Sequence, residues 1–123
     1  MEMNKFFKSI VDQDGASVVI CNLEHEIIYM NPAAILDNKK EGRGSLLGRN
    51  LMECHNQDSR EKIQGVIDWF GEDERHNIMF IYHDEKKNKD VYMVALRDEG
   101  KLIGYYEKHE YRNVETKKPY EFY

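Results

Sequence analysis

The second half of the chain contains three strand-like segments that are separated by short polar turns. Residues 77–83 and 91–97 alternate two sets of side chains along their length, and residues 102–110 form a third segment. The connections, residues 84–89 and 98–100, are polar and short. Alternation with period two predicts strands, and short turns join neighbouring antiparallel strands. The chain is therefore expected to fold around an antiparallel sheet.

Two further strands, residues 17–23 and 26–30, are predicted in the first half. Between these strands and the last three lies the clearest helix, which is expected to begin at Asp58 or Ser59 and to end at Gly71. Its apolar face is formed by Ile63, Val66, Ile67 and Phe70. The predicted fold class is α+β: one five-stranded antiparallel sheet with helices covering one face.

The N-terminal segment is expected to be an amphipathic helix outside this sheet. Its apolar side chains recur at helical spacing and comprise Met3, Phe6, Phe7, Ile10 and Val11. This stripe needs a cover, either the chain's own sheet or a second copy, and we predict that it is a homodimer interface. The expected organisation is helix 1–14, domain 15–112 and a polar, aromatic tail 113–123.

Composition excludes several classes of partner. The net charge of −5, without a basic stripe, argues against a nucleic-acid surface. No apolar segment approaches the roughly 20 residues that span a bilayer, and the N-terminus lacks a signal-peptide pattern. Cys21 and Cys54 have no CxxC spacing, which favours free thiols. A cytoplasmic protein without a membrane or nucleic-acid partner is expected.

The order of elements, together with three local sequences, resembles the PAS (Per-Arnt-Sim) domain family. Ile27–Ala34 looks like the family's second strand with the Asn and small residues that follow it. Leu47–Leu51 is similar to the family's short motif of a glycine, a basic residue and an apolar residue before the long helix. Arg97–Gly104 is similar to the hairpin that leads into the family's last strand. The resemblance implies a PAS-like, non-enzymatic domain for sensing and signal transduction.

A narrower resemblance involves Gly48–His55. A bacterial PAS subgroup carries Cys-His-Pro-Pro here, whereas this chain has Cys54-His55 followed by Asn56-Gln57. The Asp-Ile-Thr that commonly closes PAS domains is replaced by His109–Arg112, and only a tail follows. The expectation is a bacterial-type regulatory domain that acts on a separate effector protein.

The resemblance also implies where a small ligand would bind: between the inner sheet face and the helices. Such pockets are lined mainly by apolar residues with few polar groups. The predicted lining is Val19, Cys21, Ile35, Leu51, Ile63, Ile67, Phe80, Val94 and Tyr105. The alternative is that these side chains simply fill the core.

Cys54 and His55 are the candidate ligands of a heme iron, because thiolate and imidazole both bind iron. A heme-based redox or gas sensor is therefore the alternative function, and a small enzyme with Cys54 as nucleophile is a third. The opposing interpretation is a helix-entry segment in which Cys54 packs as a small apolar side chain. No cofactor is assigned, and the remaining histidines lack the spacing of a metal site.

Overall fold

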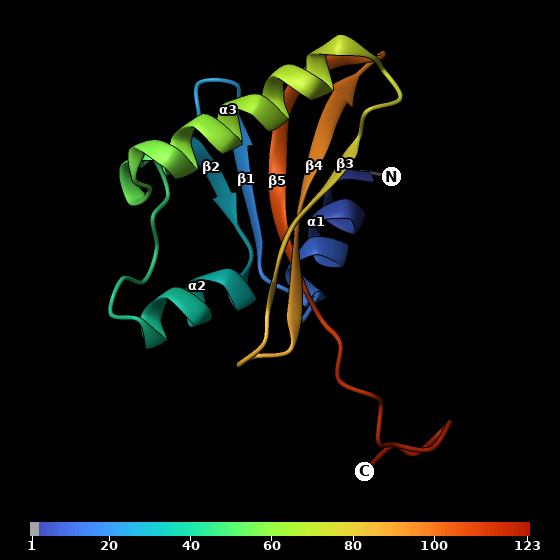
Figure 1. The fold of residues 1–123 in the computed structure, drawn as a ribbon. Coiled ribbons are helices and arrows are strands. Elements are labelled where there is room, and N and C mark those ends of the chain that lie inside the picture. The colour runs from blue at the N-terminus through green and yellow to red at the C-terminus, as the bar shows by residue number, and fades with distance from the viewer. Residues whose placement is uncertain (1–2) are drawn as a thin grey trace.

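A computed structural model describes residues 3–123, so the first two residues of the predicted segment 1–14 lie outside the described residues. Its elements follow the predicted order along the chain (Figure 1). They are α1 (Met3–Gln13), β1 (Val18–Asn22), β2 (Ile27–Met30), α2 (Pro32–Lys40), the 3₁₀ helix η1 (Leu51–Cys54), α3 (Gln57–Glu72), β3 (Ile78–Asp84), β4 (Lys89–Asp98) and β5 (Lys101–Tyr111).

The strands form one sheet in the order β2-β1-β5-β4-β3, and every neighbouring pair is antiparallel. The longest ladder joins β4 to β5, from the pair Lys89 and Tyr111 to the pair Asp98 and Lys101. The long helix α3 crosses one face of this sheet, and α2 lies on the same side (Figure 1). The predicted α+β fold with a five-stranded antiparallel sheet is confirmed.

The core lies between α3 and the inner face of the sheet, which is the face toward α3. Phe70 from α3 and Tyr105 from β5 are both fully buried there, at 0% exposure. Cys21 from β1 and Met93 from β4 belong to the same cluster. Burial of these large apolar side chains supplies the main driving force that holds helix and sheet together.

Two details of the helices differ from the sequence prediction. Residues 37–45 are polar and contain two glycines, a pattern that predicts a loop, but α2 continues to Lys40 because no helix-breaking residue occurs before Gly42. The cap of α3 is Asn56, whose side chain accepts a hydrogen bond from the Ser59 backbone N–H at 2.9 Å, rather than Asp58 or Ser59.

A β-bulge in β3 overturns part of the predicted inner face. The register between β3 and β4 shifts between Phe80 and Tyr82, and Phe80 stacks against Tyr92 with ring centroids 5.6 Å apart. Phe80 and Val94 therefore lie on the outer face, and the prediction that they line the inner face is wrong. The extra residue reverses the alternation, so Tyr82 reaches the inner side instead.

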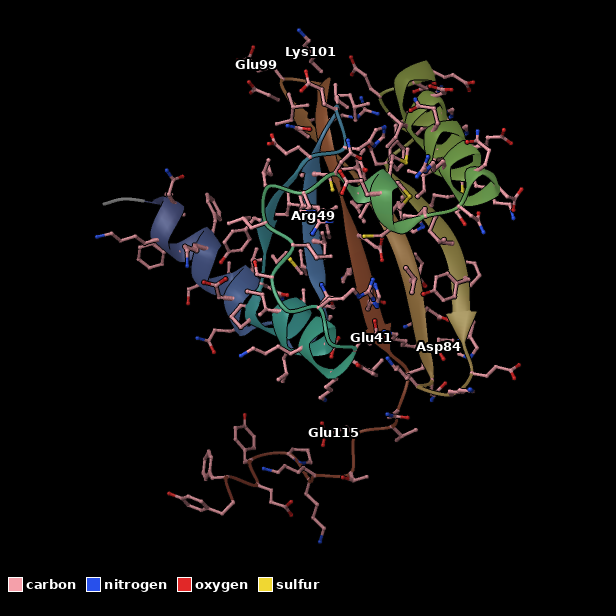
Figure 2. All side chains as sticks on the ribbon, turned by 90° about the vertical axis from the view of Figure 1, so that its left-hand side faces the viewer. Glu41, Arg49, Asp84, Glu99, Lys101 and Glu115 are labelled. Carbon is pink, nitrogen blue, oxygen red and sulfur yellow. The ribbon has the colours of Figure 1, made fainter. Side chains whose placement is uncertain are left out.

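Helix α1 lies on the opposite side of the sheet from α3 (Figure 2). It is anchored through Asp12, which accepts hydrogen bonds from Lys8 and from the Tyr29 hydroxyl of β2, and through Val11, which is partly buried. The other predicted interface residues are exposed: Met3 at 46%, Phe6 at 53%, Phe7 at 55% and Ile10 at 69%. Within residues 3–123 no helix has the length and apolar character needed to cross a bilayer.

Candidate functional site

A pocket of about 330 Å³ opens between the inner sheet face, α2 and η1. The more exposed charged groups of its lining form its rim and include Glu41, just after α2, and Asp84, at the end of β3 (labelled in Figure 2). Apolar side chains form part of the wall: Val19, Ile27, Met30, Leu46 and Leu51. The rest of the lining is Ser17, Asp37, Asn38, Glu41, Arg43, Cys54, His55, Tyr82, Asp84, Lys87, Lys89, Glu107 and His109.

The predicted lining residues separate into three groups. Val19 and Leu51 do line the pocket. Five others belong to the packed core beside it: Cys21, Ile67 and Tyr105 are buried, and Ile35 and Ile63 pack against them. Phe80 and Val94 are on the other face of the sheet. The pocket is therefore not mainly apolar, as predicted, because charged and polar side chains form much of its lining.

Lys89 is the most unusual residue of the pocket, because it is only 4% exposed. Its ammonium makes no ion pair or hydrogen bond with any described residue. Its recorded contact is with the ring of Tyr111, 6.0 Å from the ring centroid. Lysine is rarely buried without a partner, since removing an unpaired charge from water is costly.

Glu107 and His109 on β5 form a pair on the same inner face as Lys89. The His109 Nε2 and Glu107 Oε1 atoms are 2.8 Å apart. Burial raises the pKa of Glu107, but the hydrogen bond from His109 and the electrostatic interactions with His109, His55 and Lys89 lower it by more, so the net shift is downward. Glu107 is therefore ionised at neutral pH, and its carboxylate is engaged by His109. The other ring nitrogen, His109 Nδ1, is buried without a partner among the described residues.

Two residues with hydroxyl groups also line the pocket, the buried Ser17 and the 47% exposed Tyr82. Ser17 is 5% exposed, and its carbonyl accepts a hydrogen bond from the His109 backbone N–H at 3.1 Å. Burial and the negative charges of Glu107, Asp84 and Glu41 raise the pKa of Tyr82. Tyr82 therefore keeps its proton and can donate a hydrogen bond to a ligand.

The charged groups at the rim are paired with one another. Glu41 at the end of α2 pairs with Arg43, and its Oε1 lies 3.6 Å from the Nζ atom of Lys87. The hydrogen bond from Arg43 lowers the pKa of Glu41. Asp84 accepts a hydrogen bond from the Lys87 backbone N–H at 3.2 Å. Lys89, the cross-strand neighbour of Asp84, is a buried charge of the lining that forms no ion pair with a described residue.

Cys54 and His55 both line the pocket, at the step from η1 into α3. Cys54 is an exposed free thiol, and the His55 carbonyl accepts a hydrogen bond from Arg60. No group of three His, Cys, Asp or Glu side chains in residues 3–123 is arranged to hold a metal ion. The charged lining also fits an apolar heme macrocycle poorly, since such cofactors occupy mostly apolar pockets.

The sequence prediction missed Ser17, Tyr82, Lys89, Glu107 and His109. A signal for three of them was present. Lys89 is in phase with the inward residues Val91 and Met93 of β4, and Glu107 and His109 are in phase with Tyr105 of β5. A charged residue in the buried phase of a strand indicates a polar pocket or a buried pair. Tyr82 could not be found this way, because the bulge changes its face.

Sequence comparison finds no match: no family model and no curated protein matches this chain. The fold, however, is similar to that of solved structures. A C-terminal domain from Streptococcus mutans has a TM-score of 0.64 and 18% identity, covering 87% of this chain and 83% of that one. A PAS domain from Colwellia psychrerythraea has a TM-score of 0.62 and 14% identity, covering 89% and 96%.

A sensory box sensor histidine kinase from Vibrio cholerae has a TM-score of 0.52 and 14% identity, covering 86% of each chain. At these identities the likeness concerns the fold and not the ligand or partner. The strand order, the helices over one face and these neighbours agree with one another. The chain therefore has the PAS fold.

Proposed function

We propose that this protein is a non-enzymatic sensory domain that binds a small polar ligand in the pocket and signals to a separate protein partner. The observation that carries the proposal is the pocket itself: a space of about 330 Å³ inside a PAS fold, with buried polar groups that face no described partner. That volume is within the range of small-molecule sites. The PAS domain and sensor kinase among its structural neighbours support a sensory role.

Signalling requires that the ligand bind two states of the protein with different affinity. The pocket is bounded by α2 and η1 on one side and by β5 and β4 on the other. A ligand held between these elements would favour the arrangement in which both sides contact it. We propose that this change is passed on through a homodimer whose contact surface includes the exposed face of α1.

The test is native mass spectrometry of the purified, unheated protein, followed by thermal melting with a panel of small polar metabolites. Val19→Phe should fill the pocket and abolish any mass increment or rise in Tm. Val94→Phe places the same extra volume on the outer face and should leave binding unchanged. Equal loss of binding in both variants, or none in either, would contradict a ligand site in this pocket.

The heme alternative has one supporting observation, the position of Cys54 and His55 in the pocket wall. Heme titration of the same sample tests it. A Soret band that His55→Ala removes would support heme binding, and a flat visible spectrum would exclude it. The charged lining favours the first proposal.

A further inference from the structure

We infer that the pocket selects a small anionic ligand, such as a carboxylate, and that the ammonium of Lys89 is its anchor. This inference rests on the proposed function, since it names the chemical class of ligand for the same pocket. It follows from a juxtaposition: a buried cation that forms no ion pair, hydroxyl groups in the same lining, and the carboxylates of Glu107 and Glu41 already held by other partners.

The first step concerns the charge of Lys89. At 4% exposure its ammonium is largely removed from bulk water, and it forms no ion pair or hydrogen bond with a described carboxylate. Its charge does help to lower the pKa of Glu107 and of Asp84, its cross-strand neighbour on β3, so these two acids are its nearest counter-charges. The Lys89 backbone is fixed at the start of β4, where it pairs with Tyr111 of β5. An anion in the pocket would supply the missing counter-charge in a low-dielectric setting, where charge-assisted hydrogen bonds are strongest.

The second step concerns the competing carboxylates. Glu107 is bonded to His109, and Glu41 is paired with Arg43 and Lys87. Asp84 accepts a backbone hydrogen bond in its own turn. These three acids have partners of their own. The fourth acid of the lining, Asp37, has no ion pair or side-chain hydrogen bond among the described residues but is only partly buried, whereas Lys89 is 4% exposed. A cationic ligand could pair with Asp37 but would leave the buried Lys89 uncompensated.

The third step concerns the size of the ligand and its other contacts. The hydroxyl groups of Ser17 and Tyr82 can both donate to an oxyanion, and neither has a hydrogen-bond partner among the described residues. The pocket volume of about 330 Å³ limits the ligand to a small molecule. A compact ligand with one or two negative charges fits both constraints.

The experiment compares charged probes with neutral isosteres at constant ionic strength. Sodium acetate, sodium succinate and inorganic phosphate are tested against acetamide and succinamide by thermal melting and calorimetry. At least one anion should raise Tm, and its neutral isostere should bind at least about ten-fold more weakly. Lys89→Met should weaken anion binding by a similar factor.

Lys108→Met is the matched control, because Lys108 is on the opposite face of the sheet and is paired with Glu110 at 2.6 Å. It should leave anion binding unchanged. Without ligand, Lys89→Met should melt at or above the wild-type Tm, since it removes an unpaired buried charge. A markedly lower Tm would contradict the premise that Lys89 has no partner.

Two outcomes separate this inference from the proposed function. If amides stabilise the protein as well as acids do, and Lys89→Met binds both like the wild type, the anion inference is wrong while the pocket remains a ligand site. If no probe distinguishes the wild type from Lys89→Met, and Val19→Phe carries the same bound mass as the wild type, both the anion inference and the proposed function are wrong.

Glu107→Gln removes a negative charge from the pocket and should tighten anion binding. Weaker anion binding in this variant would count against Lys89 as the anchor.

Discussion

A single side chain, Asn31, joins the N-terminal helix, the first strand and the second helix. It is fully buried, and its Oδ1 accepts hydrogen bonds from the backbone N–H groups of Val18 at 2.9 Å and Ala34 at 3.0 Å. Its Nδ2 donates to the carbonyls of Val11 at 3.0 Å and Ala16 at 2.9 Å. Asn31→Ala leaves four backbone groups, two in buried and two in partly buried hydrogen bonds, without this partner and should lower the free energy of unfolding by about 3 kcal/mol.

Urea unfolding measures this loss as a shift of the midpoint at constant m-value. Asn4→Ala is the control, because Asn4 is exposed on α1 and alanine favours a helix. Asn31→Asp keeps the acceptor but turns the donor into a carboxylate that faces two carbonyls. If Asn31→Asp is as stable as the wild type, the assignment of these hydrogen bonds is wrong.

The two cysteines should react very differently with iodoacetamide. Burial raises the pKa of the Cys21 thiol to about 11, with a smaller upward contribution from Glu107 and an opposing one from Tyr105. Cys21 is also 1% exposed, whereas Cys54 is exposed. At pH 8 the native protein should take up one label, at Cys54. Cys54→Ser should remain unlabelled until denaturant is added, and rapid labelling of the native variant would contradict the packing described for Cys21.

At the scale of elements, Arg97 fastens the end of α3 to the hairpin between β4 and β5. Its guanidinium donates to the Asn77 side chain at 2.7 Å and to four backbone carbonyls, those of Phe70, Asp73, His76 and Gly100. Lysine cannot reproduce this planar set of donors, so Arg97→Lys should cost about 2 kcal/mol. Urea unfolding checks the value.

Arg75→Lys is the matched control, since the Arg75 side chain is 88% exposed and holds one exposed ion pair with Asp73. Its midpoint should stay within experimental error of the wild type. Equal midpoints for the two lysine variants would show that Arg97 does not fasten α3 to the hairpin.

The elements were predictable from the sequence to a greater extent than the pocket was. Alternation and short turns are local signals, so five antiparallel strands and the long helix after Asn56 could be anticipated. The lining of the pocket depends on non-local register. The pairing of β4 with β5 places Lys89, Glu107 and His109 on the same inner face, and the bulge between Phe80 and Tyr82 turns Tyr82 to that face. Strand phase marks the three charged residues as inward, but no local pattern encodes the bulge.

At the scale of the whole molecule, the sheet separates two surfaces with different properties. The side that carries α3 encloses the polar pocket. The other side carries α1 with its exposed apolar residues and, on β3 of the outer sheet face, Ile78 at 62% and Phe80 at 54% exposure. Exposed apolar surface is a common feature of protein association sites. Ligand and partner would therefore act from opposite faces, with β1 and β5 between them.

The last prediction concerns this apolar surface. If α1 mediates a homodimer, light scattering after gel filtration should give about twice the 14.7 kDa chain mass. The double variant Phe6→Glu with Ile10→Glu places two charges in the contact and should yield monomers with an unchanged circular dichroism spectrum. Leu47→Glu is the control, since Leu47 is 59% exposed, comparable to Phe6, but lies in the loop before η1. Two results would rule out α1 as the dimer contact. One is dissociation of the dimer by Leu47→Glu, and the other is a wild type that stays monomeric over a 100-fold range of concentration up to its solubility limit.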